Sequence, residues 1–221
     1  MKSGKRLYEN GLSVCLFACF LVTEIGMSLV GHTQYNQQQT EHLLPSITYL
    51  QYLTSGAFVS ATMENWESEF LQMSAYVLFT TFLYQKGSAE SKTHGQLDYV
   101  DADPRAVRTT SSTPWPVRRG GFLLKLYENS LSIALLSLFF ISFFLHAMGS
   151  AKQYNEQQLQ HGDPTVSLQQ YLGTAQFWFE SLQNWQSEFF SVGMMVVLTI
   201  FLRQRGSPES KPVAMPHAEN P

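Results

Sequence analysis

A long segment of this chain occurs twice, in the same direction, at an offset of 119 residues. Residues 7–92 align with residues 126–211 without a gap, and about 34 of the 86 aligned pairs are identical. A repeat of this length predicts two copies of one structural unit in tandem. The shared blocks are LYEN at residues 7 and 126, QYNxQQ at 34 and 153, NWxSEF at 65 and 184, and QxGSxESK at 85 and 204.

Each copy contains two apolar stretches that suit a membrane helix. The runs at residues 12–30 and 131–148 are long enough to cross a hydrocarbon core of about 30 Å. The second stretches are shorter, and a run of about 14 apolar residues also fits a buried soluble helix. A polar, aromatic shoulder lengthens them, so we predict helices over about 66–85 and 185–204, each starting on a tryptophan. The predicted fold is an all-α membrane protein with four transmembrane helices, forming two tandem parallel-repeat helical hairpins.

The segments between these helices have distinct compositions. The loop between the two predicted helices of each copy places Ser or Thr after a proline and then Leu and Tyr at helical intervals. This pattern predicts a short interfacial helix in each loop. The central linker and the tail are rich in Pro, Gly, Ser and Thr and lack apolar periodicity, so we expect both to be disordered. The first repeat domain, the linker, the second repeat domain and the tail are residues 1–92, 93–121, 122–211 and 212–221.

Positive charge lies on one side of the predicted helices. Three of the 14 Lys and Arg (Lys2, Lys5 and Arg6) precede the first helix, seven lie in residues 86–125, and three follow the fourth helix. Lys152 alone lies in an outer loop. By the positive-inside rule, we expect the termini and the linker on the cytoplasmic side. The basic N-terminus also resembles a signal peptide, but its internal copy favours a retained helix.

Several function classes find little support in the composition. The net charge is -3 and the basic residues form no stripe, so no nucleic-acid partner is expected. The only cysteines, Cys15 and Cys19, lie within one apolar run, where they predict apolar packing and no disulfide framework. The chain has no zinc-ligand spacing, phosphate-binding glycine loop or nucleophile–base motif. We therefore predict no metal, no cofactor and no catalytic residue.

Two duplicated carboxylates are the leading candidate functional residues. Glu69 and Glu188 follow the shared tryptophan and fall near the outer edge of the predicted hydrocarbon region. An ionised carboxylate is costly there unless it is paired or hydrated. One interpretation is a cation or proton site where the two copies meet. The other, which the pattern favours, is a carboxylate in the outer interface with its head group in water.

The other candidates are polar residues on or near the predicted helices. The duplicated Asn and Trp pairs either shape a ligand pocket or have a structural role, with Trp at the membrane interface and Asn bonding between helices. The structural role is favoured. The duplicated histidines suggest a metal site on the outer face, although one His per copy is a weak ligand set. Two ionisable residues within the spans are not duplicated, and a structural pair or reach to the interface is favoured for them. The duplicated Asn and Trp pairs are Asn65 with Trp66 and Asn184 with Trp185. The duplicated histidines are His42 and His161, and the two unduplicated ionisable residues are Glu24 and His146.

The motifs LYEN, QYNxQQ, NWxSEF and QKGSxESK together resemble an uncharacterised bacterial membrane-protein family, catalogued as a domain of unknown function. The resemblance covers nearly everything except the linker and the tail. It implies a bacterial inner-membrane protein and brings no activity, cofactor or active residues.

We therefore expect a non-catalytic structural or interaction protein in the bacterial cytoplasmic membrane. Its partners are the lipid bilayer and other membrane proteins, periplasmic proteins or a second copy of the chain. The alternative is a small-solute or cation conduit with Glu69 and Glu188 near its outer mouth.

Overall fold

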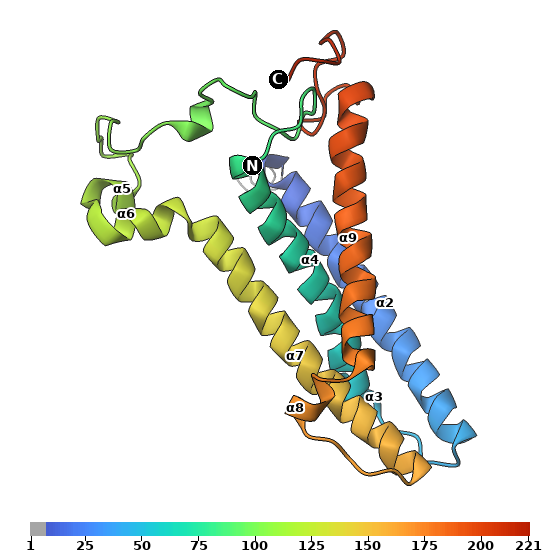
Figure 1. Ribbon diagram of the computed structural model, residues 1–221. Coiled ribbons are helices and arrows are strands. Elements are labelled where there is room, and N and C mark those ends of the chain that lie inside the picture. Colours follow the sequence, from blue (N-terminus) through green and yellow to red (C-terminus); the bar gives the residue numbers. More distant parts are fainter. Residues whose placement is uncertain (1–7) are drawn as a thin grey trace. The chain divides into compact units, whose positions relative to one another are not determined.

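The computed structural model describes residues 8–221, and all regular structure in that range is helical (Figure 1). The predicted basic flank of Lys2, Lys5 and Arg6 lies outside the described residues. The chain divides into two compact units, each built from two separate segments. The first unit is Met1–Thr62 with Leu145–Thr174, and the second is Met63–Phe144 with Ala175–Pro221.

Within residues 8–221, two helices are long and apolar enough to cross a membrane. Helices α2 (Gly11–Glu41) and α7 (Ser130–His161) contain 18-residue windows with mean hydropathies of 2.1 and 2.2. Apolar side chains along α2 are strongly exposed, with Phe17 at 68 % and Val22 at 71 %. An apolar surface of this extent indicates contact with lipid or with another protein. Both helices continue past the predicted apolar spans into the QYNxQQ motifs.

The other two long helices are α4 (Gly56–Phe82) and α9 (Ala175–Phe201), each of 27 residues. We predicted that they would end near Gln85 and Gln204, and they end about one turn earlier. The backbone N–H of Gln85 donates to Ser91 Oγ at 2.8 Å, and the equivalent bond forms after α9. Because a side-chain oxygen takes this N–H, the helical hydrogen-bond ladder ends before it.

The loops between α2 and α4 and between α7 and α9 contain the predicted short helices, α3 (Tyr49–Leu53) and α8 (Leu168–Tyr171). A capping box starts α3, because Thr48 and Gln51 each accept a hydrogen bond from the other's backbone N–H. The same box starts α8. Tyr52 of α3 and Tyr171 of α8 are buried, and their burial holds each short helix against the rest of the first unit.

The asparagine of each QYNxQQ motif ties an outer loop to its helix. Asn36 Oδ1 accepts from the N–H of Ile47 at 2.9 Å, and its Nδ2 donates to the carbonyl of Ile47 at 3.0 Å. Asn155 makes the same two bonds with Val166, at 2.7 and 2.8 Å. Each loop therefore returns to a fixed position beside the helix that precedes it.

Within the first unit, the start of α4 lies in close contact with the end of α7. A Cβ atom added at Gly149 would lie 2.7 Å from the backbone nitrogen of Ser60, and one added at Gly56 would lie 2.7 Å from the Gly149 oxygen. The hydroxyls of Ser60 and Ser150 are hydrogen-bonded across the same contact. Small residues permit this close helix packing, as in many membrane proteins.

The segment between the two copies contains η1 (Tyr99–Asp101) and α5 (Trp115–Arg119). Helix α6 (Gly121–Glu128) follows at once and leads into α7. Arg105 lies 3.1 Å from the carboxylate of Glu128, which joins the linker to α6. Composition alone did not reveal this path, because it is made by a few local polar contacts.

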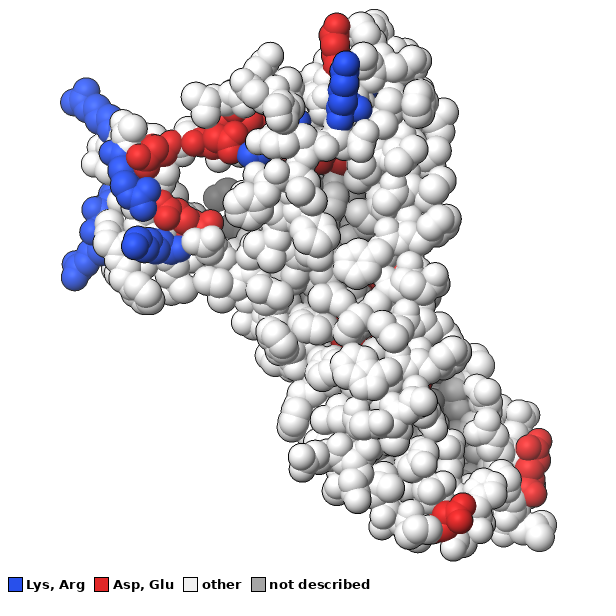
Figure 2. All heavy atoms as spheres, in the orientation of Figure 1, with Lys and Arg blue, Asp and Glu red and all other residues white. Residues whose placement is uncertain are grey.

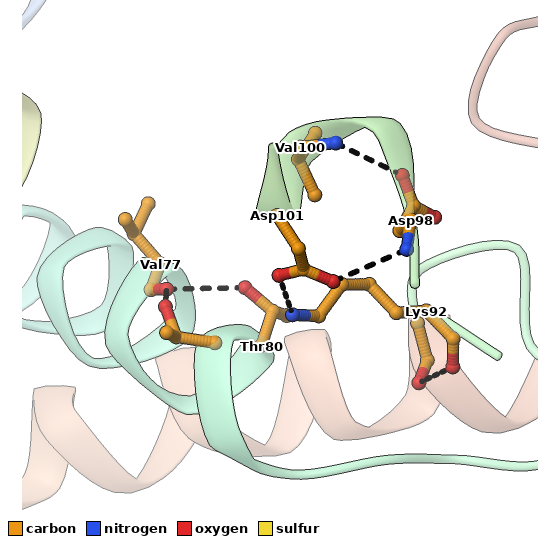
Figure 3. A network of polar contacts seen from close by, with 8 residues as sticks. Val77, Thr80, Lys92, Asp98, Val100 and Asp101 are labelled. Carbon is orange, nitrogen blue, oxygen red and sulfur yellow. Dashed lines mark hydrogen bonds and ion pairs between the residues drawn. The ribbon is translucent and has the colours of Figure 1, made fainter. Parts of the chain in front are cut away.

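One of these contacts closes the turn around η1 (Figure 3). Lys92 Nζ donates to Asp101 Oδ1 at 2.7 Å, and the other oxygen of Asp101 accepts from the backbone N–H of Asp98 at 3.3 Å. The hydrogen bond from Lys92 lowers the pKa of Asp101 below its ordinary value, and the same bond raises the pKa of Lys92. The pair thus favours the ionised form of both groups.

The tail, residues 212–221, makes hydrogen bonds with the residue that precedes it. Lys211 is only 1 % exposed, and its ammonium group has three donors to place. They are directed to backbone carbonyls of the tail itself, at 2.9 to 3.2 Å, those of Pro216, His217 and Glu219. The tail therefore folds around one buried cation.

Candidate functional site

The two QYNxQQ motifs line a single open hollow of about 350 Å³ in the first unit. The motifs continue α2 and α7 beyond their apolar runs, so their polar side chains project from helices. Each helix supplies half of the lining. The lining includes Tyr35 and Gln39 from α2, His42 directly after it, and Glu156, Gln157 and His161 from α7.

A chain of hydrogen bonds crosses this hollow. Gln39 Nε2 donates to the Tyr35 hydroxyl at 3.2 Å, and that hydroxyl donates to Glu156 Oε2 at 3.4 Å. Nδ1 of His161 lies 2.8 Å from the carbonyl oxygen of Gln157, in the preceding turn of α7. The first chain joins the two copies of the motif, and the second contact orients an imidazole ring at the rim.

The duplicated histidines come together here. The ring centroids of His42 and His161 are 6.4 Å apart, with the rings edge to face. A metal site needs further ligands, and residues 8–221 contain no group of three or more His, Cys, Asp or Glu placed to hold an ion. The described residues therefore place no third His, Cys, Asp or Glu beside these two histidines to complete a metal site.

The hollow carries negative charge and no opposing cation. Glu41 and Glu156 line it, and no Lys or Arg does. In Figure 2, Lys and Arg gather over the segment with α5 and α6 in the second unit. The far ends of α2 and α7, in the first unit, show only acidic groups on this face. Amide and carboxylate groups suit a polar or cationic ligand.

A second polar group lies in the second unit, around the Asn–Trp pair of α9. Asn184 Nδ2 donates to Glu64 Oε1 at 2.6 Å, and Trp185 Nε1 donates to Glu67 Oε1 at 2.8 Å. Glu67 is fully buried. Sequence analysis missed both glutamates because, around the NWxSEF motif, it weighed only the residues that the two copies share. The second copy has glutamine at both equivalent positions, and that difference was the available signal.

The other predicted residues of this region lie nearer the surface. Glu69 is exposed and Glu188 is partly exposed, and the two carboxylates are near enough to interact electrostatically. Asn65 and Trp66 of the first copy are exposed, unlike their counterparts on α9. The NWxSEF motif therefore has different surroundings in its two copies.

A family model matches residues 3–220, almost the whole chain. The chain belongs to this family, described as Domain of unknown function (DUF6766). No curated protein and no solved structure matches the chain. Membership of DUF6766 confirms the resemblance drawn from the motifs and assigns no activity.

The two unduplicated ionisable residues of this DUF6766 chain have different surroundings within the first unit. Glu24 is half-buried and accepts a hydrogen bond from Thr62 Oγ1 at 3.4 Å. His146 is completely buried. Sequence analysis suggested that these residues pair with each other, and it did not find Thr62 as a partner of Glu24.

Proposed function

We propose that this DUF6766 protein is a non-catalytic interaction protein of a bacterial cytoplasmic membrane that binds a polar or cationic group in the hollow. Four helices cross the bilayer in this proposal, as two tandem hairpins with α3 and α8 in the outer interface. The apolar surfaces of α2 and α7 support the membrane location. The scarcity of Lys and Arg near the hollow supports its position on the outer side.

The observation that carries the proposal is the convergence of both QYNxQQ motifs on one open hollow. The asparagine of each motif holds the following loop through hydrogen bonds to its backbone. This role in the loop explains the asparagine but not the other residues of the motif. Tyr35, Gln39 and Glu156 instead form a hydrogen-bonded chain beside an open space. A hydrogen-bonding surface at the ends of two membrane helices is suited to recognition outside the bilayer.

Photo-crosslinking in intact membranes tests this proposal with a matched control. Gln38 lines the hollow and its exposed neighbour Gln37 does not. A photoreactive residue at position 38 should yield a discrete crosslinked species that is missing at position 37. Glu156→Gln should reduce its yield. Equal products at both positions, or none at position 38, would refute binding at the hollow.

A second candidate function is a conduit for a small solute or cation. The specific observation in its favour is the number of polar side chains within the long helices, such as the buried Glu67 and the half-buried Glu24. Ionisable groups at membrane depth often mark transport pathways. Flux in proteoliposomes that falls in Glu67→Gln, but not in Glu41→Gln at the hollow, would favour the conduit. A folded sample without flux would count against it.

A further inference from the structure

The two QxGSxESK motifs fold into the same turn in the second unit. We name residues 85–92 the first turn and residues 204–211 the second turn. In each, the backbone N–H of the glutamine donates to the second serine hydroxyl at 2.8 Å, and that of the glutamate donates to the first serine hydroxyl at 3.2 Å. The glycines have matching φ angles of 81° and 87°. These left-handed values explain why glycine occupies both positions.

The first turn is occupied by the side chain of Asn220. Its Nδ2 lies 2.8 to 3.1 Å from three backbone carbonyl oxygens, and its Oδ1 accepts from the Gly87 N–H at 2.8 Å. A carboxamide provides both the donors and the acceptor that this turn requires, whereas a carboxylate provides no donor. The three carbonyls belong to Gln85, Ser88 and Ser91.

The tail fits the first turn closely. A Cβ atom added at Gly87 would lie 2.1 Å from the carbonyl oxygen of His217, so this glycine admits the tail as well as the turn. His217 Nδ1 lies 3.0 Å from the carbonyl oxygen of Ile200 in α9. The turn of the first copy thus receives the tail that follows the second copy.

The second turn presents the equivalent groups to an open space. These are the Gly206 N–H and the carbonyls of Gln204, Ser207 and Ser210. Within residues 8–221 the structure gives no hydrogen-bond partner to the Gly206 N–H or to the carbonyls of Ser207 and Ser210. A hollow of about 380 Å³ lies against the turn, bordered also by Arg205 and Val213.

We propose that the second turn is a binding site for an asparagine side chain on another polypeptide. The ligand chemistry is that of Asn220: a primary carboxamide whose N–H groups meet the carbonyls and whose oxygen meets Gly206 N–H. Lys211 does not select a carboxylate here, because its ammonium group is already directed to the tail carbonyls. This site lies in the second unit and is independent of the function proposed for the hollow.

Glycine-selective NMR on the full chain in detergent tests the proposal. The probe is a synthetic peptide with the sequence of residues 215–221, MPHAENP, added to ¹⁵N-glycine-labelled protein. Control peptides carry the Asn220→Ala or Asn220→Asp change. We expect the Gly206 amide signal to shift and saturate with the asparagine peptide. The apparent affinity should fall about tenfold or more with either control.

A chain with Asn220→Ala serves as the positive control, because it empties the first turn. The peptide should then shift the Gly87 signal as well, whereas Gly87 in the unmodified chain should not respond. A response of Gly87 without one of Gly206 in the Asn220→Ala chain would overturn the proposal, since an empty turn then binds the peptide and the second turn does not. No response at either glycine, or equal shifts with the control peptides, would also overturn it.

Discussion

Replacing Gly149 by alanine should separate the start of α4 from the end of α7. The new Cβ would lie 2.7 Å from the backbone nitrogen of Ser60, and backbone cannot move aside as a flexible side chain can. Overpacking of this kind costs about 1–3 kcal/mol. Loss of the Ser60–Ser150 hydrogen bond adds about 1 kcal/mol. Removing a helical glycine returns about 0.5–1 kcal/mol, so the net loss is about 1–3 kcal/mol.

Thermal unfolding in detergent measures this effect, and a central loss of about 2 kcal/mol lowers Tm by about 4–8 °C. Gly26→Ala in α2 is the matched control, because nothing lies within 4 Å of the added atom. That variant should be unchanged or slightly more stable. Gly56→Ala should resemble Gly149→Ala, and the double variant should lose less than the sum because both disrupt one contact. If Gly149→Ala has the same Tm as the Gly26→Ala control, the close contact between α4 and α7 is refuted.

Three further predictions concern the loops and the linker. Asn36→Ala leaves the Ile47 N–H unpaired, at a cost of about 1–3 kcal/mol, while His32 Nε2 still lies 2.9 Å from the Ile47 carbonyl oxygen. Amide exchange should accelerate in the first loop and stay unchanged in the second. The contribution of the Lys92–Asp101 pair is present above the ordinary Asp pKa of 3.8 and is lost as pH falls through the lowered pKa of Asp101. Exchange of the Asp98 amide should accelerate in that range, and Lys92→Met should move this acceleration to higher pH, because the larger cause of the lowered pKa of Asp101 is then lost. In a cysteine-free background, an impermeant reagent should label a cysteine at Thr40 in intact cells and not one at Ser111, and the reverse pattern would invert the proposed orientation.

Apolar runs and the duplicated motifs located the four long helices and the two short loop helices, but not η1, α5 or α6. The long runs predicted α2 and α7, and the proline-led loop patterns predicted α3 and α8. The ends of α4 and α9 were placed too late, because the serine of the following turn takes the N–H that would have extended the helix. The sequence pattern thus predicted where helices form, whereas hydrogen bonds from the backbone to serine side chains determined where α4 and α9 end.

Contacts between elements were harder to predict. Gly56 and Gly149 occupy non-equivalent positions in the repeat, so comparing the copies did not mark them, although small residues spaced along a helix were a usable signal. The tail has the composition of a disordered segment. It takes a defined path because Asn220 and Lys211 find backbone carbonyls whose positions depend on folded geometry. Composition carries no information about such carbonyls.

The hydrogen bond from Trp185 to Glu67 has a consequence for how a duplicated chain can differ from a dimer. Two identical hairpins related by symmetry would carry glutamate at that position in both subunits, and each buried carboxylate costs several kcal/mol in desolvation. Covalent fusion lets one hairpin keep the acid while the other carries glutamine. A homodimer has no single substitution that reaches this state, because every mutation appears twice.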